Sequence, residues 1–169
     1  MKEPIYILLG SNLGERLKNL ELGLGHLAQV ESVKIIRSSG LYHSPAMEMS
    51  EPGPDFLNQV IEINTVLSPS QLLRELQDIE IKMGRTDKGN YKSRIIDLDI
   101  LLFGRRIVET AALTIPQAGL LKRPFATIPL VAIAPDIVHP VTKKLISEYI
   151  SVSDYNLVTL FEEHAAASH

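Results

Sequence analysis

Apolar residues recur along the chain with two different periods, one typical of strands and one typical of helices. Alternating or short continuous apolar runs predict strands at residues 5–9, 33–37, 56–66 and 94–103. Leucines spaced three or four residues apart predict two helices, one after the loop at residues 10–16 and one after Ser68. The resulting order is strand, helix, strand, strand, helix, strand. It is typical of an α+β, ferredoxin-like fold, in which helices pack on an antiparallel sheet as a three-layer α/β/α arrangement.

Each of the two predicted helices has one apolar face. The members are Leu13, Leu17, Leu20, Leu24 and Leu27 in the first helix, and Leu72, Leu73, Leu76, Ile79 and Met83 in the second. Gly84 is a suitable C-terminal stop for the second helix. Gln77 and Glu80 lie three residues apart on that helix, so we expect them close together on an exposed face.

Loops and shorter elements fill the rest of the chain. Residues 45–54 contain three prolines and predict a long connection, a kind of segment that often carries binding function. Residues 85–93 are polar and predict a loop that leads into the last strand. The remaining predictions are a brief extended piece, a helix that tolerates Pro129 and a helix near the C-terminus, at residues 113–116, 124–134 and 143–150.

The last predicted strand carries two acids within an apolar run. Because side chains alternate along a strand, Asp97 and Asp99 are expected on the same face. The other members of that face are Ile95, Leu101 and Phe103, and the opposite face consists of Ile96, Leu98 and Ile100. Buried carboxylates are costly unless they are solvated, paired with cations or bound to a metal. Magnesium takes one or two carboxylates together with phosphate oxygens, which indicates a nucleotide-phosphate site. The alternative is an edge strand with two solvated acids or a surface ion pair.

Composition narrows the class of protein. The 169 residues are 45% apolar and 22% charged, which predicts one globular domain spanning residues 1–169. The chain has no cysteine, which excludes disulfides and thiolate chemistry and is consistent with the cytoplasm. The apolar run at residues 5–9 is too short to cross a bilayer and lacks a signal-peptide pattern. A net charge of −3 without tryptophan argues against a nucleic-acid surface.

Two further features have a structural interpretation that competes with a functional one. The glycine-bearing loop at residues 10–16 opens a helix and is able to receive an anion, but it lacks the Gly-Lys-Ser/Thr ending of a P-loop. A simple turn with a helix cap is the alternative there. The histidines lack the spacing of metal ligands, so surface or hydrogen-bonded histidines are expected. They are His26, His43, His139, His164 and His169.

Six short strings stand in the order and spacing of one enzyme family. They are Gly10-Ser11-Asn12-Leu13-Gly14, Tyr42-His43-Ser44-Pro45, Asp55-Phe56-Leu57-Asn58, Leu76-Gln77-Asp78-Ile79-Glu80 with Gly84-Arg85, Arg94-Ile95-Ile96-Asp97-Leu98-Asp99-Ile100, and Arg123-Pro124-Phe125 with Pro129-Leu130. On these strings the chain resembles the 6-hydroxymethyl-7,8-dihydropterin pyrophosphokinases of folate biosynthesis, from Ile5 to about Pro140. The resemblance implies ATP-dependent transfer of pyrophosphate to the pterin hydroxymethyl group, with release of AMP.

The resemblance also implies roles for individual residues. Asp97 and Asp99 would bind two Mg²⁺ ions, and Arg85 and Arg94 would follow the phosphates as the other catalytic residues. The implied pterin contacts are Ser44, Pro45, Met47, Phe56, Asn58 and Phe125, with the phenylalanines stacking on the ring. The implied ATP contacts are Gln77, Glu80, Arg85, Tyr91, Arg94, Ile100, Thr114 and Arg123. Core packing is the competing interpretation for the phenylalanines, and a solvated surface for the arginines, Gln77 and Glu80.

Several positions depart from the pattern of that family, mainly on the nucleotide side. Lys92-Ser93 stands where Gly-Pro is usual, and Asp87 stands where a second basic residue often lies. Gln117 replaces a common histidine, and Ala112 replaces a frequent arginine. From these departures we infer weaker ATP binding or slower turnover.

Two rival functions remain. A non-catalytic pterin- or nucleotide-binding relative would share the fold, although Asp97 and Asp99 have little purpose without phosphate chemistry. A ferredoxin-like RNA-binding module needs a basic surface and aromatic residues on its sheet, whereas only 5% of the residues are aromatic. We therefore expect a monomeric enzyme whose partners are ATP and the pterin, and neither nucleic acid nor a membrane.

Overall fold

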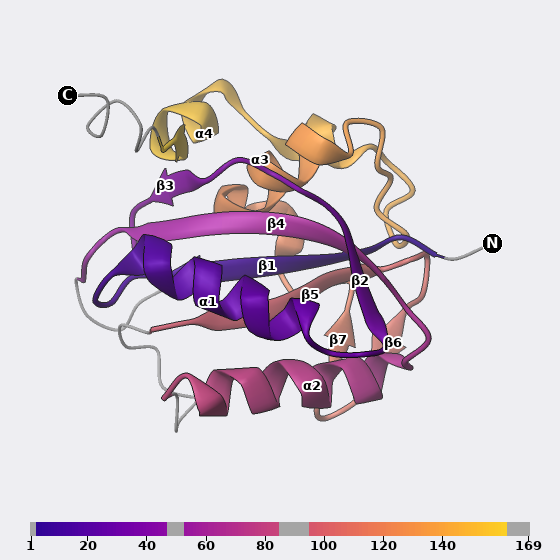
Figure 1. Cartoon of the computed structure of the whole chain (residues 1–169). Helices are drawn as coiled ribbons and strands as arrows, with labels where there is room; N and C mark the ends of the chain where they lie inside the picture. The colour runs from indigo at the N-terminus through magenta and orange to yellow at the C-terminus, as the bar shows by residue number, and fades with distance from the viewer. Residues whose placement is uncertain (1–2, 47–52, 85–94, 162–169) are drawn as a thin grey trace.

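An antiparallel sheet with helices on both faces forms the body of the protein (Figure 1). The computed structural model describes residues 3–46, 53–84 and 95–161. The strands are β1 (Ile5–Ser11), β2 (Val33–Ser38), β3 (Tyr42–Ser44), β4 (Phe56–Thr65), β5 (Asp97–Phe103), β6 (Val108–Glu109), β7 (Thr114–Ile115) and β8 (Thr159–Leu160). The helices are α1 (Arg16–Ala28), α2 (Pro69–Lys82), α3 (Pro124–Ile133) and α4 (Val152–Leu157), with 3₁₀ turns η1 (Leu120–Lys122) and η2 (Ile146–Tyr149).

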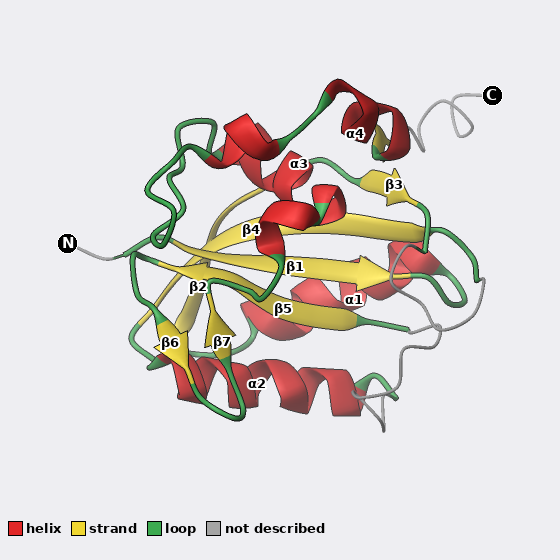
Figure 2. Cartoon of the chain, turned by 180° about the vertical axis from the view of Figure 1, so that it is seen from behind, coloured by secondary structure: helices red, strands yellow, loops and turns green. Residues whose placement is uncertain are grey.

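The strand order of the main sheet is β5-β1-β4-β3-β8, and β2 also pairs with β4. β2 and β3 pair with successive parts of β4, residues 61–65 and 56–58, so they act as one interrupted strand. Helices α1 and α2 cover one face and α3 covers the other, as Figures 1 and 2 show from opposite sides. The predicted α+β fold, with an antiparallel sheet between helical layers, is therefore confirmed.

Two apolar clusters bury the two faces of the sheet. Alternation along β1 sends Ile7 and Leu9 into the cluster under α1 and α2, and sends Tyr6 and Leu8 into the cluster under α3. Within the described residues, no helix is both long and apolar enough to cross a membrane.

The two helices predicted from leucine spacing are present, and they differ in how their N-termini are capped. At α2, Ser68 and Gln71 form a reciprocal capping box, and Gly84 follows the helix with φ +102°. At α1, Glu15 precedes the helix without a side-chain cap. Leu13 lies before that helix and is 43% exposed, so its predicted place on the buried face is wrong.

A β-bulge in β5 changes which side chains share the face of the two acids. Tyr6 pairs with Leu102 and Ile7 with Ile100, which leaves Leu101 as an extra residue. Leu101 shares the face of the two acids, as predicted, and packs in the cluster under α3. Phe103 instead belongs to the cluster under α1 and α2. The prediction that Phe103 shares the face of Asp97 and Asp99 is therefore wrong, because the bulge shifts the alternation by one residue.

The C-terminal region differs most from its prediction. Residues 124–134 form α3, with Pro129 inside it, as expected. The helix predicted at residues 143–150 is only the 3₁₀ turn η2, and α4 and β8 after it were not predicted. β8 pairs with β3 and so extends the sheet.

Candidate functional site

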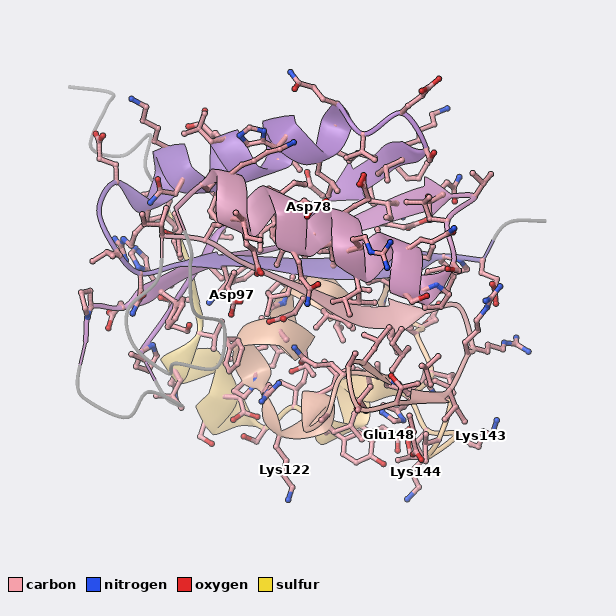
Figure 3. The ribbon with its side chains drawn as sticks, turned by 90° about the horizontal axis from the view of Figure 1, so that it is seen from below. Asp78, Asp97, Lys122, Lys143, Lys144 and Glu148 are labelled. Carbon is pink, nitrogen blue, oxygen red and sulfur yellow. The ribbon has the colours of Figure 1, made fainter. Side chains whose placement is uncertain are left out.

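The strand register brings the candidate site residues into rows across the sheet. Asp97 pairs with Gly10, Gly10 with Asn58, and Asn58 with Tyr42. Residues paired directly across antiparallel strands point to the same face. Since Leu8 and Val60 on the same strands belong to the cluster under α3, this row also faces α3. Figure 3 shows Asp97 on the side of the sheet opposite α2.

Asp97 and Asp99 share this face, as their alternation with the buried Leu98 and Ile100 requires. Both acids are half-buried, and two residues of extended chain separate them by about 7 Å. Among the described residues, no group of three or more histidine, cysteine or acidic side chains gathers as a metal site. The pair suits Mg²⁺, which is commonly held by one or two protein carboxylates and completes its shell with phosphate oxygens and water.

Gly10 makes room at the centre of the row. A Cβ atom there would lie 2.9 Å from Asn58 Oδ1 and 3.5 Å from Phe56 Cδ1. Gly10 therefore allows the Asn58 side chain to lie across β1, between the aromatic residue and the acids. Sequence reasoning missed Gly10 as a site residue, although a glycine within a buried strand is a known sign of close approach.

Two of the implied pterin contacts bond to each other. Asn58 Nδ2 donates a hydrogen bond of 2.7 Å to Ser44 Oγ, and both residues are 2% exposed. Ser44 also pairs with Phe56 across β3 and β4, so the serine, the asparagine and the phenylalanine share one face. The bond fixes the orientation of the buried amide.

The aromatic candidates lie on the same side of the sheet. Phe56 begins β4 on the α3 face, and Phe125 is the second residue of α3. Phe125 packs against the cluster under α3. Both side chains are half-buried rather than fully buried, so each keeps some surface for a ligand. Pro45 follows β3 directly and is also half-buried.

The implied nucleotide contacts are spread around β5. Thr114 is exposed on β7, and Ile100 is buried in the cluster under α1 and α2, which leaves mainly its backbone for a ligand. The carbonyl oxygen of Arg123 accepts from the amides of Ala126 and Thr127, each at 2.9 Å, and so begins α3.

The prediction that Gln77 and Glu80 share an exposed face is wrong for Glu80. Gln77 is exposed, but Glu80 is only 2% exposed, because it continues the buried stripe of Leu76 and Ile79. Glu80 Oε2 accepts a hydrogen bond of 2.8 Å from the amide of Leu98. The remaining candidates, Met47, Arg85, Tyr91 and Arg94, lie outside the described residues, as do Asp87 and Lys92-Ser93.

The loop between β1 and α1 ties the site to the start of β4. Asn12 is 1% exposed, and its Nδ2 donates to the carbonyl of Pro54 at 3.2 Å. Arg16 Nη1 donates to the carbonyl of Asp55 at 2.9 Å, and Asn19 Nδ2 donates to that of Leu13 at 2.8 Å. These bonds favour the interpretation of the loop as a turn that fixes the neighbouring segment.

Gln117 combines an altered sequence position with an unusual environment. Its amide donates to the carbonyl of Leu101 at 2.9 Å, which places it beside β5. Its Oε1 is buried and has no hydrogen-bond partner within the part of the chain that the structure describes. A buried acceptor without a partner is costly. Leu101, to which the Gln117 backbone bonds, lies two residues along β5 from Asp99.

Of the histidines, His139 is a hydrogen-bonded core residue, as predicted. It is 8% exposed, and its Nδ1 accepts from the amides of Val141 and Thr142 at 3.2 and 3.3 Å. Burial lowers the pKa of His139 below its ordinary value. His43 packs edge-on against Phe161 with ring centroids 4.9 Å apart.

An open pocket of about 390 Å³ lies beside α3, apart from the acids. Its lining is Tyr42, Ile128, Val131, Ala132, Tyr155, Val158, Thr159 and Leu160. Burial, and to a smaller extent Tyr155, raises the pKa of Tyr42. None of the predicted site residues lines this pocket.

Comparison with known proteins identifies relatives of the chain. Residues 6–135 match the family described as 7,8-dihydro-6-hydroxymethylpterin-pyrophosphokinase (HPPK). A 2-amino-4-hydroxy-6-hydroxymethyldihydropteridine pyrophosphokinase of Haemophilus influenzae is 36% identical over 156 residues, which are 92% of this chain and 96% of that protein. Folic acid synthesis protein fol1 of Pneumocystis carinii is 41% identical over 147 residues, which are 87% of this chain and 20% of that protein.

The relatives differ from this chain in length, and the solved structures are similar to it mainly in fold. This chain spans about a fifth of the fol1 proteins of Pneumocystis carinii and Schizosaccharomyces pombe. A wild-type Plasmodium falciparum HPPK-DHPS crystal structure with pteroate has a TM-score of 0.71 and 15% identity. The match covers 88% of this chain and 42% of that one, and it supports the fold.

Proposed function

Because the chain belongs to the 7,8-dihydro-6-hydroxymethylpterin-pyrophosphokinase family, we propose that it transfers pyrophosphate from ATP to 6-hydroxymethyl-7,8-dihydropterin in folate biosynthesis. The observation that carries the proposal is the row on the α3 face of the sheet. It brings Asp97, a candidate metal ligand, and the Asn58–Ser44 pair, a candidate pterin contact, onto one surface. A phosphate site and a pterin site on the same face of the sheet are what this reaction requires.

The proposed reaction forms one bond and breaks one. The hydroxymethyl oxygen of the pterin bonds to the β-phosphorus of ATP, and the bond between that phosphorus and the oxygen bridging to the α-phosphorus breaks. The products are the pterin diphosphate and AMP, and the hydroxyl proton passes to solvent or a nearby base. Such a transfer depends mainly on positioning and on neutralising negative charge.

Asp97 and Asp99 are the residues that would hold two Mg²⁺ ions. Bound Mg²⁺ supplies positive charge that neutralises and aligns the triphosphate. The strand places the two acids on one face, with Cα atoms about 7 Å apart, as a shared phosphate site needs. Arg85 and Arg94 are proposed to add positive charge from the segment before β5.

The pterin is proposed to lie on the α3 face, between Phe56 and Phe125. Stacking on two aromatic faces suits a flat, polar-edged ring. Asn58, held by Ser44 at 2.7 Å, presents its amide in one orientation to the ring edge. Ser44, the last residue of β3, and Pro45 and Met47, which follow it in the sequence, are the further proposed contacts.

The ATP side rests on the resemblance alone for its residue roles. Its proposed contacts are Gln77, Arg85, Tyr91, Arg94, Ile100, Thr114 and Arg123. Glu80, which the resemblance also implies, is instead buried against the amide of Leu98. A single domain, a monomeric state, a cytoplasmic location, and the lack of nucleic-acid and membrane partners also stay predictions.

The function is tested by mixing the purified protein with ATP, Mg²⁺ and 6-hydroxymethyl-7,8-dihydropterin, and separating AMP from ADP by chromatography. We expect AMP only when the pterin is present, and no AMP from Asp97→Ala. A folded protein that binds the pterin without forming AMP would favour the alternative, a non-catalytic binding relative.

A further inference from the structure

Glu80 is a buried acid that the proposed reaction does not explain. It lies on α2, is 2% exposed, and its Oε2 accepts from the amide of Leu98 at 2.8 Å. Burying a carboxylate is costly unless hydrogen bonds offset the loss of water. A glutamate in the apolar stripe of α2, where a leucine would pack without that cost, therefore calls for a role.

Its partner, Leu98, is the residue between the two candidate metal ligands. β5 stands at one end of the strand order in the described sheet, with β1 on its inner side. In an antiparallel pair, successive amides face alternately toward and away from the neighbouring strand. Since the Leu98 amide faces Glu80 on α2, the amides of Asp97 and Asp99 face β1.

The backbone that carries the two acids is thus held from both sides. β1 fixes it at Asp97 and Asp99, through their pairing with Gly10 and Leu8. Glu80 fixes it at Leu98, from the opposite side. A shift of β5 at this point would move both carboxylates, so the hydrogen bond restrains their spacing and direction.

We propose that Glu80 is a positioning residue, which holds the backbone at Leu98 so that Asp97 and Asp99 meet the metal ions together. The inference rests on the proposed function of that pair. Glu80 acts through the Leu98 amide, and its carboxylate lies at the edge of the sheet rather than on the α3 face. This role differs from the surface contact with nucleotide that its sequence position implies.

The test compares two conservative variants with opposite expectations. Glu80→Gln keeps an acceptor at the same reach but loses the charge, whereas Glu80→Asp keeps the charge but is one methylene shorter. Positioning predicts that Glu80→Asp weakens Mn²⁺ binding by about tenfold, as changes to groups behind metal ligands commonly do. It predicts affinity close to that of the unchanged protein for Glu80→Gln. Mn²⁺ binding is measured by titration with a non-hydrolysable ATP analogue present.

Two control variants on α2 separate this role from charge and from stability. Asp78→Asn removes a charge from the exposed face of the same helix, where Figure 3 labels Asp78. Leu73→Ala loosens the packing of α2 while keeping the Glu80 side chain that bonds to the Leu98 amide. Thermal unfolding compares its loss of stability with that of Glu80→Asp. Both controls should bind Mn²⁺ as the unchanged protein does. Pterin affinity should stay constant in all four variants.

Four results would overturn the inference. The first is an unchanged Mn²⁺ affinity in Glu80→Asp, and the second is a larger loss of Mn²⁺ affinity in Glu80→Gln than in Glu80→Asp. The third is a loss of Mn²⁺ affinity in Asp78→Asn equal to that in Glu80→Asp. The fourth is an equal loss of Mn²⁺ affinity in Leu73→Ala when the two variants have the same stability. The second would make Glu80 a direct charge contact, the third a general charge effect, and the fourth a structural residue. If the unchanged protein fails to bind Mn²⁺ with nucleotide, the proposed metal site fails first and the inference falls with it.

Discussion

Gly10→Ala is the substitution that most directly probes the packing of the pterin side. The new Cβ would lie 2.9 Å from Asn58 Oδ1, closer than a Cβ atom approaches another heavy atom, and 3.5 Å from Phe56 Cδ1. Asn58 has little freedom to move, since it is 2% exposed and bonded to Ser44 at 2.7 Å. Either the asparagine rotates and loses that bond, or β1 and β4 separate.

The size of the effect follows from these two responses. Overpacking a core costs about 1–3 kcal/mol, and the lost Asn58–Ser44 bond costs about 1 kcal/mol. We expect the free energy of unfolding to fall by about 2 kcal/mol. A displaced Asn58 also loses its proposed hydrogen bond to the pterin edge, which is worth about 1–1.5 kcal/mol of binding free energy. Since about 1.4 kcal/mol is a factor of ten, pterin binding should weaken by roughly five- to tenfold.

Pterin affinity by calorimetry and the midpoint of thermal unfolding measure the two effects. Gly25→Ala is the matched control, because a Cβ at Gly25 in α1 would meet nothing within 4 Å. That variant should gain about 0.5–1 kcal/mol from helix propensity and bind pterin unchanged. A Gly10→Ala protein with unaltered stability and pterin affinity would refute the packing argument.

Three further predictions concern a cap, a histidine and a nucleotide contact. Ser68→Ala removes the α2 capping box and should cost about 1 kcal/mol in thermal unfolding; an equal loss in the exposed Ser70→Ala would contradict this. His139 accepts hydrogen bonds from two backbone amides, and burial lowers its pKa. Its contribution to stability is therefore present above the ordinary pKa of 6.5 and is lost as the pH falls through the lower pKa of the folded state. The unfolding free energy of His139→Asn should fall less in acid, and parallel pH curves would argue against that linkage. Gln117→His should tighten ATP-analogue binding by titration, and unchanged affinity would reject the inference that this departure weakens it.

The fold could be predicted because its signals are local and regular. Leucine spacing predicted α1 and α2, and Ser68 marked the beginning of α2. Phe103 shows the limit of such reasoning. Its face depends on an extra residue at Leu101, and a bulge arises from pairing with β1 rather than from alternation within β5.

The candidate site could be predicted only in part for a similar reason. Alternation was enough to place Asp97 and Asp99 on one face. The row from Asp97 through Gly10 to Asn58 required the register of three strands that are distant in sequence. Glu80 was placed at the surface because a charged residue usually lies there, whereas a backbone amide of β5 provides a buried partner.

The C-terminal elements offered weaker signals still. α4 has six residues and β8 has two, too few for either period to stand out. β8 forms through its pairing with β3, which is a tertiary contact. Short elements of this kind are defined by their neighbours more than by their own residues.

The most direct test of the central claim follows the phosphorus atoms of ATP. Separate reactions with ATP labelled at the α-, β- or γ-phosphorus are run with Mg²⁺ and 6-hydroxymethyl-7,8-dihydropterin, and the pterin product is isolated. Pyrophosphoryl transfer predicts β and γ label in the pterin and α label only in AMP. Label from the γ position alone in the pterin, or no label in it from any position, would contradict the account.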